Sequence, residues 1–305
     1  MSTPQIILSG FADEGSKVAA EQFTMLRALG MSYYSIRFVD VGEGVKNAMK
    51  LEDGEIRRLC ELHDQFEVQV SSIGSPIGKI KLVDQEDGTH NIYQPIDEYL
   101  ETLVPRAIEL AHAFGTKLIR GFSFYPPKDA DPWQYVDQAA EYVARVVERC
   151  AAEDVYYGLE VEANLVGRNG ALLRAIRERV NSDHIYLIFD GANIVCQGYD
   201  TEETYQEYQA MKAHVGWMHI KDYQRAPGEE WQGYVNEEQL HRMVPADIGD
   251  SGHERILRDF KERLPDLTAE LQGRGIPGVF LDLEPHVKGG GQFGGYSGPD
   301  GFGAA

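Results

Sequence analysis

Residues 217–222 have the sequence WMHIKD, a short apolar run with a histidine, a lysine and an aspartate at its end. Three further runs in the second half of the chain follow this pattern: LEVEAN at 159–164, LIFD at 187–190 and FLDLEP at 280–285. Each run is typical of a buried strand that ends on a polar residue. Because the carboxyl ends of neighbouring parallel strands lie at one edge, these polar side chains are expected to meet.

Short apolar runs alternate with amphipathic segments along the whole chain, which predicts repeated strand and helix units. The predicted strands are residues 5–9, 33–38, 67–73, 117–122, 156–161, 185–189, 216–220 and 279–283. The predicted helices include residues 20–28, 96–113, 133–152, 170–180, 203–213 and 254–263. Eight such units indicate a (β/α)8 TIM barrel, an α/β fold. The alternative is an open doubly wound sheet, which usually has a glycine-rich turn after its first strand; FADEGSK at 11–17 is not such a turn.

Two segments interrupt this alternation within what we expect to be a single domain over residues 1–305. The polar stretch 223–251 follows the seventh strand and has the length of an active-site cover or an interface element. The tail 288–305 is rich in glycine and contains Phe293, Tyr296 and Phe302. The tail is either a frayed terminus or a segment that packs these rings over the barrel mouth or against a partner.

Composition excludes several classes of function. The net charge of −20 argues against a general nucleic-acid surface, because binding phosphates requires clustered lysine and arginine. No apolar run approaches the ~20 residues that a membrane span requires, and the start of the chain lacks the pattern of a secretory signal. The 3 cysteines are widely spaced and form no metal or disulfide motif. We expect a cytoplasmic protein.

The four strand ends predict a metal site. Glu162, Asp190, His219 and Glu284 supply three carboxylates and one imidazole, a donor set that suits Mn²⁺ or Mg²⁺ better than a metal that prefers thiolates. Glu160 lies on the same face of its strand as Glu162 and is expected to support the site from a deeper position.

Other polar residues at strand ends are candidates for catalysis or substrate binding. Lys221 lies on the same face as His219 and can place an ammonium beside a substrate oxygen. The candidate substrate contacts are Arg37, Lys79, Arg120, Ser123, Asn193 and His286.

These motifs resemble those of the xylose isomerase-like barrel superfamily of sugar isomerases, epimerases and inosose dehydratases. The resemblance lies in E-A-N at Glu162, D-G-A-N at Asp190, H-I-K-D at His219 and L-E-P-H at Glu284, with S-P-I-G-K at 75–79 in support. It implies a divalent metal on those four residues, with Mn²⁺ favoured and Mg²⁺ or Co²⁺ as alternatives. It also implies that Glu162 and Glu284, assisted by Lys221, move protons at a carbon beside the carbonyl of a keto sugar, through an enediolate.

Two features keep other functions open. Many members of the superfamily carry a histidine where this chain has Asn193, and a neutral amide cannot relay protons. The tail and GLEVEANLV at 158–166 are also similar to the large subunits of bacterial C-glycoside deglycosidases, which eliminate the aglycone from 3-oxo-glycosides. A lyase acting on such glycosides or on an inosose is therefore an alternative to an isomerase or epimerase. A sugar-binding barrel without turnover is the third hypothesis.

The expected partners follow from these hypotheses. The ligand is a small-molecule sugar or glycoside, and neither nucleic acid nor a membrane is expected to bind. We expect a homo-oligomer, or a hetero-oligomer with a small β-rich subunit if the resemblance to the deglycosidases holds.

Overall fold

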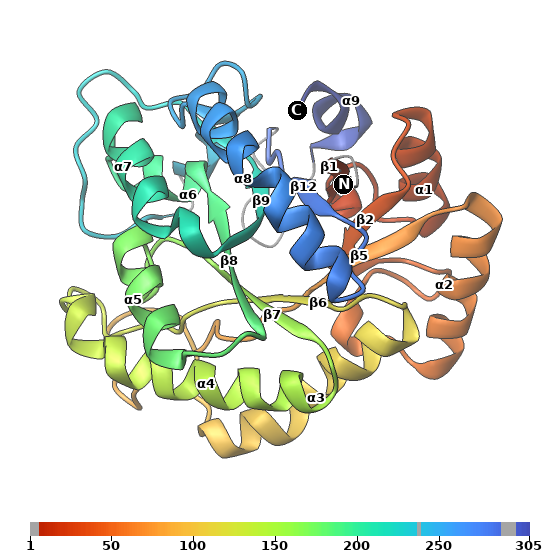
Figure 1. The fold of residues 1–305 in the computed structure, drawn as a ribbon, viewed down its shortest axis with the longest axis horizontal. Coiled ribbons are helices and arrows are strands. Elements are labelled where there is room, and N and C mark those ends of the chain that lie inside the picture. Colours follow the sequence, from red (N-terminus) through yellow and green to blue (C-terminus); the bar gives the residue numbers. More distant parts are fainter. Residues whose placement is uncertain (1–5, 237–238, 288–296) are drawn as a thin grey trace.

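Eight parallel strands form the central sheet of the computed structural model, which describes residues 6–236, 239–287 and 297–305. The strands, in sheet order, are β1 (Ile6–Gly10), β12 (Val279–Leu283), β9 (Val215–Ile220), β8 (Ile185–Asp190), β7 (Tyr156–Glu160), β6 (Leu118–Gly121), β5 (Gln69–Gly74) and β2 (Tyr33–Ile36). The two end strands, β1 and β2, pack side by side, so the sheet curls into a nearly closed barrel (Figure 1). The predicted TIM barrel is confirmed, and each strand end lies within two residues of its predicted position.

Helices follow the strands and surround the barrel (Figure 1). They are α1 (Ala19–Ala28), α2 (Asp53–Phe66), α3 (Ile96–Ala113), α4 (Val136–Ala152), α5 (Gly170–Val180), α6 (Gly191–Val195), α7 (Thr201–Met211), α8 (His253–Gly273) and α9 (Gly298–Ala304). The start of α7 shows how local sequence sets a boundary, because Asp200 and Glu203 form a capping box. The helix predicted over 254–263 continues through Pro265 to Gly273. Among the described helices, none has the length and hydropathy needed to cross a bilayer.

Short elements complete the loops between these units. Two antiparallel pairs are β3 (Phe38–Val39) with β4 (Lys46–Asn47) and β10 (Asp222–Tyr223) with β11 (Met243–Val244). Turns of 3₁₀ helix are η1 (Ala12–Glu14), η2 (Ala48–Lys50), η3 (Pro132–Tyr135), η4 (Lys212–His214) and η5 (Gln239–Arg242). The pair β10 and β11 and the turn η5 lie within the long segment predicted at 223–251 or at its edge.

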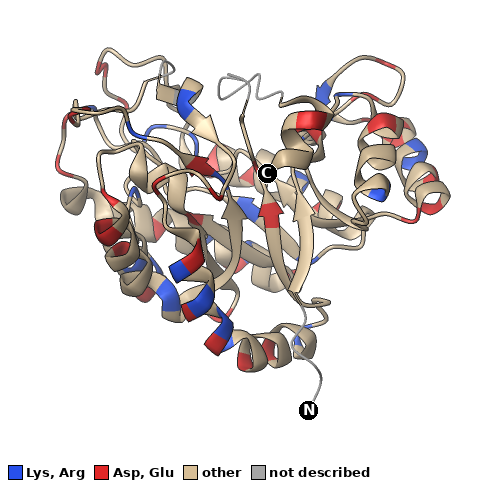
Figure 2. Ribbon diagram, turned by 90° about the horizontal axis from the view of Figure 1, so that it is seen from above, with Lys and Arg blue, Asp and Glu red and all other residues tan. Residues whose placement is uncertain are grey.

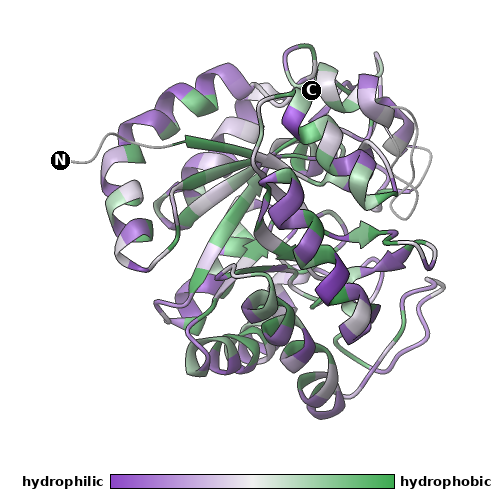
Figure 3. Cartoon of the chain, turned by 90° about the vertical axis from the view of Figure 1, so that its right-hand side faces the viewer, coloured by the Kyte–Doolittle hydropathy of each residue, from purple (hydrophilic) through white to green (hydrophobic). Residues whose placement is uncertain are grey.

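Most of the strands are buried on both faces, as expected for a parallel sheet covered by helices, whereas Ile6 and Leu8 of β1 are exposed. Every residue of β8 and β9 is buried. The strands in Figure 3 are largely hydrophobic, whereas the helices alternate between hydrophobic and hydrophilic residues. Figure 2 shows that Lys, Arg, Asp and Glu lie mainly on the surrounding helices and loops. Charged side chains in the barrel interior are therefore exceptional and mark the site described below.

The end of the chain packs against the barrel. Phe302, on α9, is fully buried in the main hydrophobic core, and a Cβ placed on Gly10 would lie 2.9 Å from its ring. α9 also contacts η1, which directly follows β1. Residues 297–305 are therefore not a frayed terminus. Of the three aromatic residues expected to pack, Phe302 does so. Phe293 and Tyr296 lie outside the described residues.

Candidate metal centre and its cavity

Four buried side chains meet at the carboxyl ends of adjacent strands. Glu160 ends β7, Asp190 ends β8, His219 lies near the end of β9 and Glu284 directly follows β12. Their candidate ligand atoms, one from each residue, all lie within 4.8 Å of one another. β7, β8, β9 and β12 are neighbours in the sheet, and their carboxyl ends form the face where barrels place their active sites. Three carboxylates and an imidazole are a donor set for a hard divalent cation, so this cluster can hold such a metal.

β7 contributes Glu160 to the cluster, and the predicted ligand Glu162 lies outside it. β7 ends at Glu160, one residue earlier than predicted, so Glu160 still points into the barrel and is fully buried. Beyond the strand the chain turns, and Asn164 has a φ of 67°. The Glu162 carboxylate instead lies 3.4 Å from the Lys79 ammonium and accepts a 3.3 Å hydrogen bond from Asn193 Nδ2. The candidate cluster therefore contains Glu160 at the place where Glu162 was expected.

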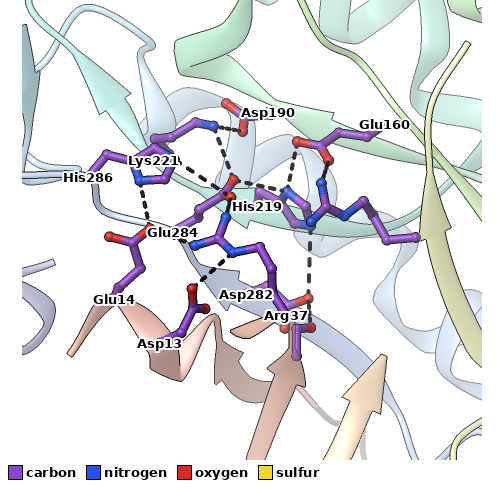
Figure 4. A network of polar contacts seen from close by, with 12 residues as sticks. Asp13, Glu14, Arg37, Glu160, Asp190, His219, Lys221, Asp282, Glu284 and His286 are labelled. Carbon is purple, nitrogen blue, oxygen red and sulfur yellow. Dashed lines mark hydrogen bonds and ion pairs between the residues drawn. The ribbon is translucent and has the colours of Figure 1, made fainter. Parts of the chain in front are cut away.

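Two basic side chains lie among the acids of the cluster (Figure 4). Lys221 Nζ lies 2.8 Å from Asp190 Oδ2 and 3.1 Å from Glu284 Oε2. His219 Nδ1 lies 3.0 Å from Glu160 Oε1 and 3.6 Å from Glu284 Oε2. Lys221 therefore contacts two of the candidate ligands directly.

Burial and ion pairing oppose each other in setting the pKa values of the cluster. Burial disfavours the charged form of His219, but Glu160 and Glu284 outweigh it and raise the pKa of the imidazole to about 10. Burial also disfavours charged Glu160, yet His219 and Arg120 lower the pKa of its carboxyl to about 2. Burial prevails at Asp190 and raises its pKa to about 6, despite Lys221. The cluster thus attracts positive charge, either as protons on its bases or as a divalent cation.

Arg37, a predicted substrate contact, also holds Glu284 in position. It follows β2 and forms ion pairs with three carboxylates, those of Asp13 at 3.1 Å, Glu14 at 2.8 Å and Glu284 at 2.7 Å (Figure 4). Because Lys221 binds the other oxygen of Glu284, both carboxylate oxygens are fixed. A carboxylate held this way has little freedom to rotate, as a metal ligand requires.

Arg120, the corresponding residue of β6, plays the same part for Glu160. Its Nη1 donates a 3.1 Å hydrogen bond to Glu160 Oε2. The guanidinium lies 5.0 Å from the ring centroid of Phe11 and 4.6 Å from that of Phe122, within cation–π range of both. Each of the two arginines predicted to bind substrate therefore also orients one carboxylate of the cluster.

A cavity of about 660 Å³ opens beside the cluster. Among the described residues, those predicted for the site that line it are Arg37, Lys79, Arg120, Glu162, Asn193, Lys221, Glu284 and His286. Cavities that bind small molecules usually measure ~300–1,000 Å³. Charged and amide side chains, among them Lys79, Glu162 and Asn193, line part of this cavity, which suits a ligand with several hydroxyl groups.

Ser123 does not belong to this site. It is fully buried, and its Oγ accepts a 2.7 Å hydrogen bond from the backbone N–H of Gly167. It is also not among the described residues that line the cavity. The prediction failed because Ser123 follows β6 after Gly121 and turns toward the loop after β7.

His286 reaches the cavity from the other side. Its backbone has a φ of 50°, and its Nδ1 lies 2.6 Å from Glu14 Oε1. Burial raises the pKa of the Glu14 carboxyl, but His286 and Arg37 outweigh it and lower that pKa to about 2. Ser297, just before α9, donates a 3.0 Å hydrogen bond to Glu14 Oε2. The end of the chain is therefore attached to the rim of the cavity through Glu14.

A second cavity, of about 390 Å³, adjoins the first. Tyr125, Asn164 and Tyr234 line both cavities, and Trp231 lines the outer one. The segment 223–251 is held here by a reciprocal pair of 2.9 Å hydrogen bonds, since Asn164 Nδ2 donates to Val235 O and Val235 N–H donates to Asn164 Oδ1. This long segment therefore forms part of the wall of both cavities.

Asp282 is the residue of this region that sequence reasoning missed. It is fully buried beneath the cluster, where burial raises the pKa of its carboxyl. Its Oδ2 accepts a 2.8 Å hydrogen bond from Ser35 Oγ. The run at 280–285 contained the signal, because Asp282 and Glu284 lie two positions apart and so face the same side of β12.

Comparison with protein families agrees with this architecture. Residues 23–288 match the family model described as xylose isomerase-like TIM barrel. No curated protein matches the chain.

Solved structures share the fold at low sequence identity. A xylose isomerase-like TIM barrel protein from Mycobacterium smegmatis, in complex with magnesium, has a TM-score of 0.64 and 18% identity over 98% of this chain and 92% of its own. The probable 3-DHS dehydratase from Bacillus anthracis has a TM-score of 0.63 and 17% identity over 92% and 89%. D-allulose 3-epimerase from Methylomonas sp., in complex with D-allulose, has a TM-score of 0.60 and 13% identity over 94% and 87%.

Proposed function

Because this chain belongs to the xylose isomerase-like TIM barrel family, we propose that it is a divalent-metal-dependent isomerase or epimerase of a keto sugar or sugar derivative. One observation carries the proposal: the buried cluster of Glu160, Asp190, His219 and Glu284 lies next to a cavity of about 660 Å³ that is lined in part by charged side chains. The epimerase and the magnesium complex among the similar structures support the same reading.

The proposed chemistry is proton transfer at a carbon beside a carbonyl. The four residues of the cluster would hold the metal, which when bound supplies a Lewis acid for the carbonyl oxygen. Glu162 and Glu284 both line the cavity, one from the loop after β7 and one from the end of β12. One of these carboxylates takes the proton from the substrate carbon, and the other donates a proton to the resulting enediolate to form the product.

Lys221 and Arg37 hold Glu284 in one orientation and, against burial, keep its carboxylate ionised. Each donates a hydrogen bond to one of its oxygens, at 3.1 Å and 2.7 Å. Both cations also line the cavity, where they favour negative charge that develops on a substrate oxygen. The proposed substrate contacts remain Arg37, Lys79, Arg120, Asn193 and His286.

Metal analysis and hydrogen exchange test this proposal together. We expect the purified protein to carry about one divalent ion per chain, with Mn²⁺ the most active and Mg²⁺ or Co²⁺ as substitutes. The holoenzyme should exchange the α-hydrogen of a keto sugar with D₂O. Glu162→Gln and Glu284→Gln should abolish the exchange, whereas Glu141→Gln, a change of an exposed residue on α4, should not. Exchange that persists in both active-site variants would contradict the assignment of proton transfer to these glutamates, whereas no exchange in the metal-loaded wild type would favour a sugar-binding barrel.

A lyase is the second candidate, and the outer cavity favours it. The additional 390 Å³, lined in part by Trp231 and two tyrosines, provides room for a second group attached to the sugar. A lyase would begin with the same proton abstraction and then expel that group. Incubation with 3-oxo-glucosides and analysis of the products separates the two functions, because release of free aglycone indicates elimination and a rearranged or epimerised sugar indicates isomerisation.

A further inference from the structure

The barrel interior below the cluster is polar. Ser9 on β1, Ser35 on β2, Ser71 on β5 and Asp282 on β12 are each no more than 2% exposed. The interior of a TIM barrel is usually filled by bulky aliphatic side chains. Polar groups at this depth therefore need a reason beyond packing.

The serines form a connected network that ends on Asp282. Ser9 Oγ lies 2.6 Å from Ser71 Oγ, which lies 3.0 Å from Ser35 Oγ. Ser35 also lies 2.8 Å from Ser72 Oγ and donates a 2.8 Å hydrogen bond to Asp282 Oδ2. The carboxylate of Asp282 is thus held in one orientation by hydroxyl groups from neighbouring strands.

Asp282 faces the imidazole of His219. The two residues are opposite each other in the parallel register of β12 and β9. His219 Nε2 lies 4.0 Å from Asp282 Oδ2. Within the described part of the chain, His219 Nε2 and Asp282 Oδ1 are both buried and lack a hydrogen-bond partner. Buried polar groups are seldom left without a hydrogen-bond partner, so an unpaired ring nitrogen and an unpaired carboxylate oxygen this deep indicate a function for the pair.

The other ring nitrogen of His219 faces the acids. Nδ1 lies 3.0 Å from Glu160 and 3.6 Å from Glu284, so it is the nitrogen that points to the centre of the cluster. A histidine that binds a metal through one nitrogen carries its proton on the other, and that N–H usually meets a carboxylate or a carbonyl. Here the group on that side is Asp282.

We propose that Asp282 is a positioning residue for the metal site, which accepts the Nε2–H of His219 and so directs Nδ1 toward the metal. The inference rests on the proposed function, because it requires that the cluster binds a metal. Two hydrogen bonds through a water would span ~4.5 Å or more, so the 4.0 Å gap favours direct contact. A shift of His219 Nε2 by about 1 Å toward Asp282 brings it within the ~3 Å of a hydrogen bond. The serine network keeps the carboxylate in place for this contact.

The test is metal affinity, which requires no substrate. Protein stripped with a chelator is titrated with Mn²⁺ by calorimetry and with Co²⁺ by visible absorption. Asp282→Asn should weaken both affinities by ~10–100-fold, the usual effect of removing such a partner from a metal-binding histidine, and it should change the Co²⁺ ligand-field bands. Ser35→Ala, which removes the anchor of the carboxylate, should cause a smaller loss in the same direction.

A matched control separates this role from a general effect on the fold. Asp259→Asn alters another acid that is well packed, bound by Lys212, Tyr205 and Gln209 and remote from the cluster. It should lower the melting temperature without changing metal affinity. Wild-type metal affinity and Co²⁺ spectra in both Asp282→Asn and Ser35→Ala would overturn the role of Asp282. Failure of the wild-type protein to bind either metal would instead overturn the proposed function.

Discussion

Lys221 Nζ lies 2.8 Å from Asp190 Oδ2, so an ammonium occupies the edge of the acidic cluster. The same nitrogen also contacts Glu284, at 3.1 Å. A divalent cation bound to Asp190 and Glu284 would compete with this ammonium for the same oxygens. Lys221 therefore has two effects: it neutralises the acids, and it opposes a metal at them.

Replacing Lys221 by methionine should make these two effects visible. Removing one partner of a buried ion pair leaves the other charge unpaired and costs ~3–5 kcal/mol, so the metal-free variant should melt at a lower temperature. Mn²⁺ should bind more tightly and recover most of that stability, while turnover falls. Thermal melts with and without Mn²⁺ measure the first two effects. Lys212→Met, which removes a partly exposed partner of Asp259, is the control. Weaker Mn²⁺ binding in Lys221→Met would show that Lys221 does not compete with the metal.

Exchanging either glutamate of the β7 region for glutamine should separate metal binding from proton transfer. Glu160→Gln should weaken Mn²⁺ binding by ~100-fold, at the upper end of the losses seen when metal sites are disturbed. Glu162→Gln should leave Mn²⁺ binding nearly unchanged but lower kcat by ~10²–10⁴-fold, the usual contribution of a general acid or base. Calorimetry and steady-state kinetics on the same preparations measure the two effects. The reverse pattern would restore Glu162 as the ligand.

The stability of the metal-free protein should fall as the pH rises above neutrality. The pKa of His219 is raised from 6.5 to about 10 in the folded protein, chiefly by Glu160 and Glu284 acting against burial. A raised pKa means that the folded state binds the proton more tightly than the unfolded state. The stabilisation is therefore fully present below pH 6.5 and is lost as the pH approaches 10.

Urea denaturation of chelator-treated protein between pH 6.5 and 10 measures this loss. His219→Gln should flatten the dependence, and saturating Mn²⁺ should reverse it, because metal binding requires the neutral imidazole. Metal affinity should correspondingly increase with pH over the same range. A metal-free stability that does not change between these pH values would contradict the assignment to His219.

Phe302 should contribute strongly to stability although only three residues follow it in the sequence. Its side chain is fully buried against the start of the barrel, so Phe302→Ala should cost ~3–5 kcal/mol. Phe302→Leu keeps most of the apolar volume and should cost much less. Urea denaturation of both variants provides the measurement, and equal stability of Phe302→Ala and the wild type would show that α9 is not docked in solution.

The fold could be predicted from the sequence because its signal is local and repeated. All eight strands were expected, since short apolar runs alternate with amphipathic segments along the chain. The meeting of Asp190, His219 and Glu284 follows from the same pattern, because parallel strands bring their carboxyl ends to one face.

The remaining features depend on geometry that single runs do not contain. Glu160 and Glu162 face the same side of an extended chain, so the choice between them rests on where β7 ends. The ion pair between Arg37 and Glu284 joins residues that are 247 positions apart in the sequence, and it requires the closed barrel. Asp282 resembled an ordinary interior position until β12 and β9 were placed side by side.

The two hydrogen bonds between Asn164 and Val235 join the segment that lines both cavities to the turn that follows Glu162. Asn164 lies two residues after Glu162, and Val235 belongs to the long segment that lines both cavities. Outward movement of this segment at Val235 would break both bonds that join it to the turn after Glu162. A ligand that favours this bonded position of the segment would therefore also favour the present position of the Glu162 carboxylate.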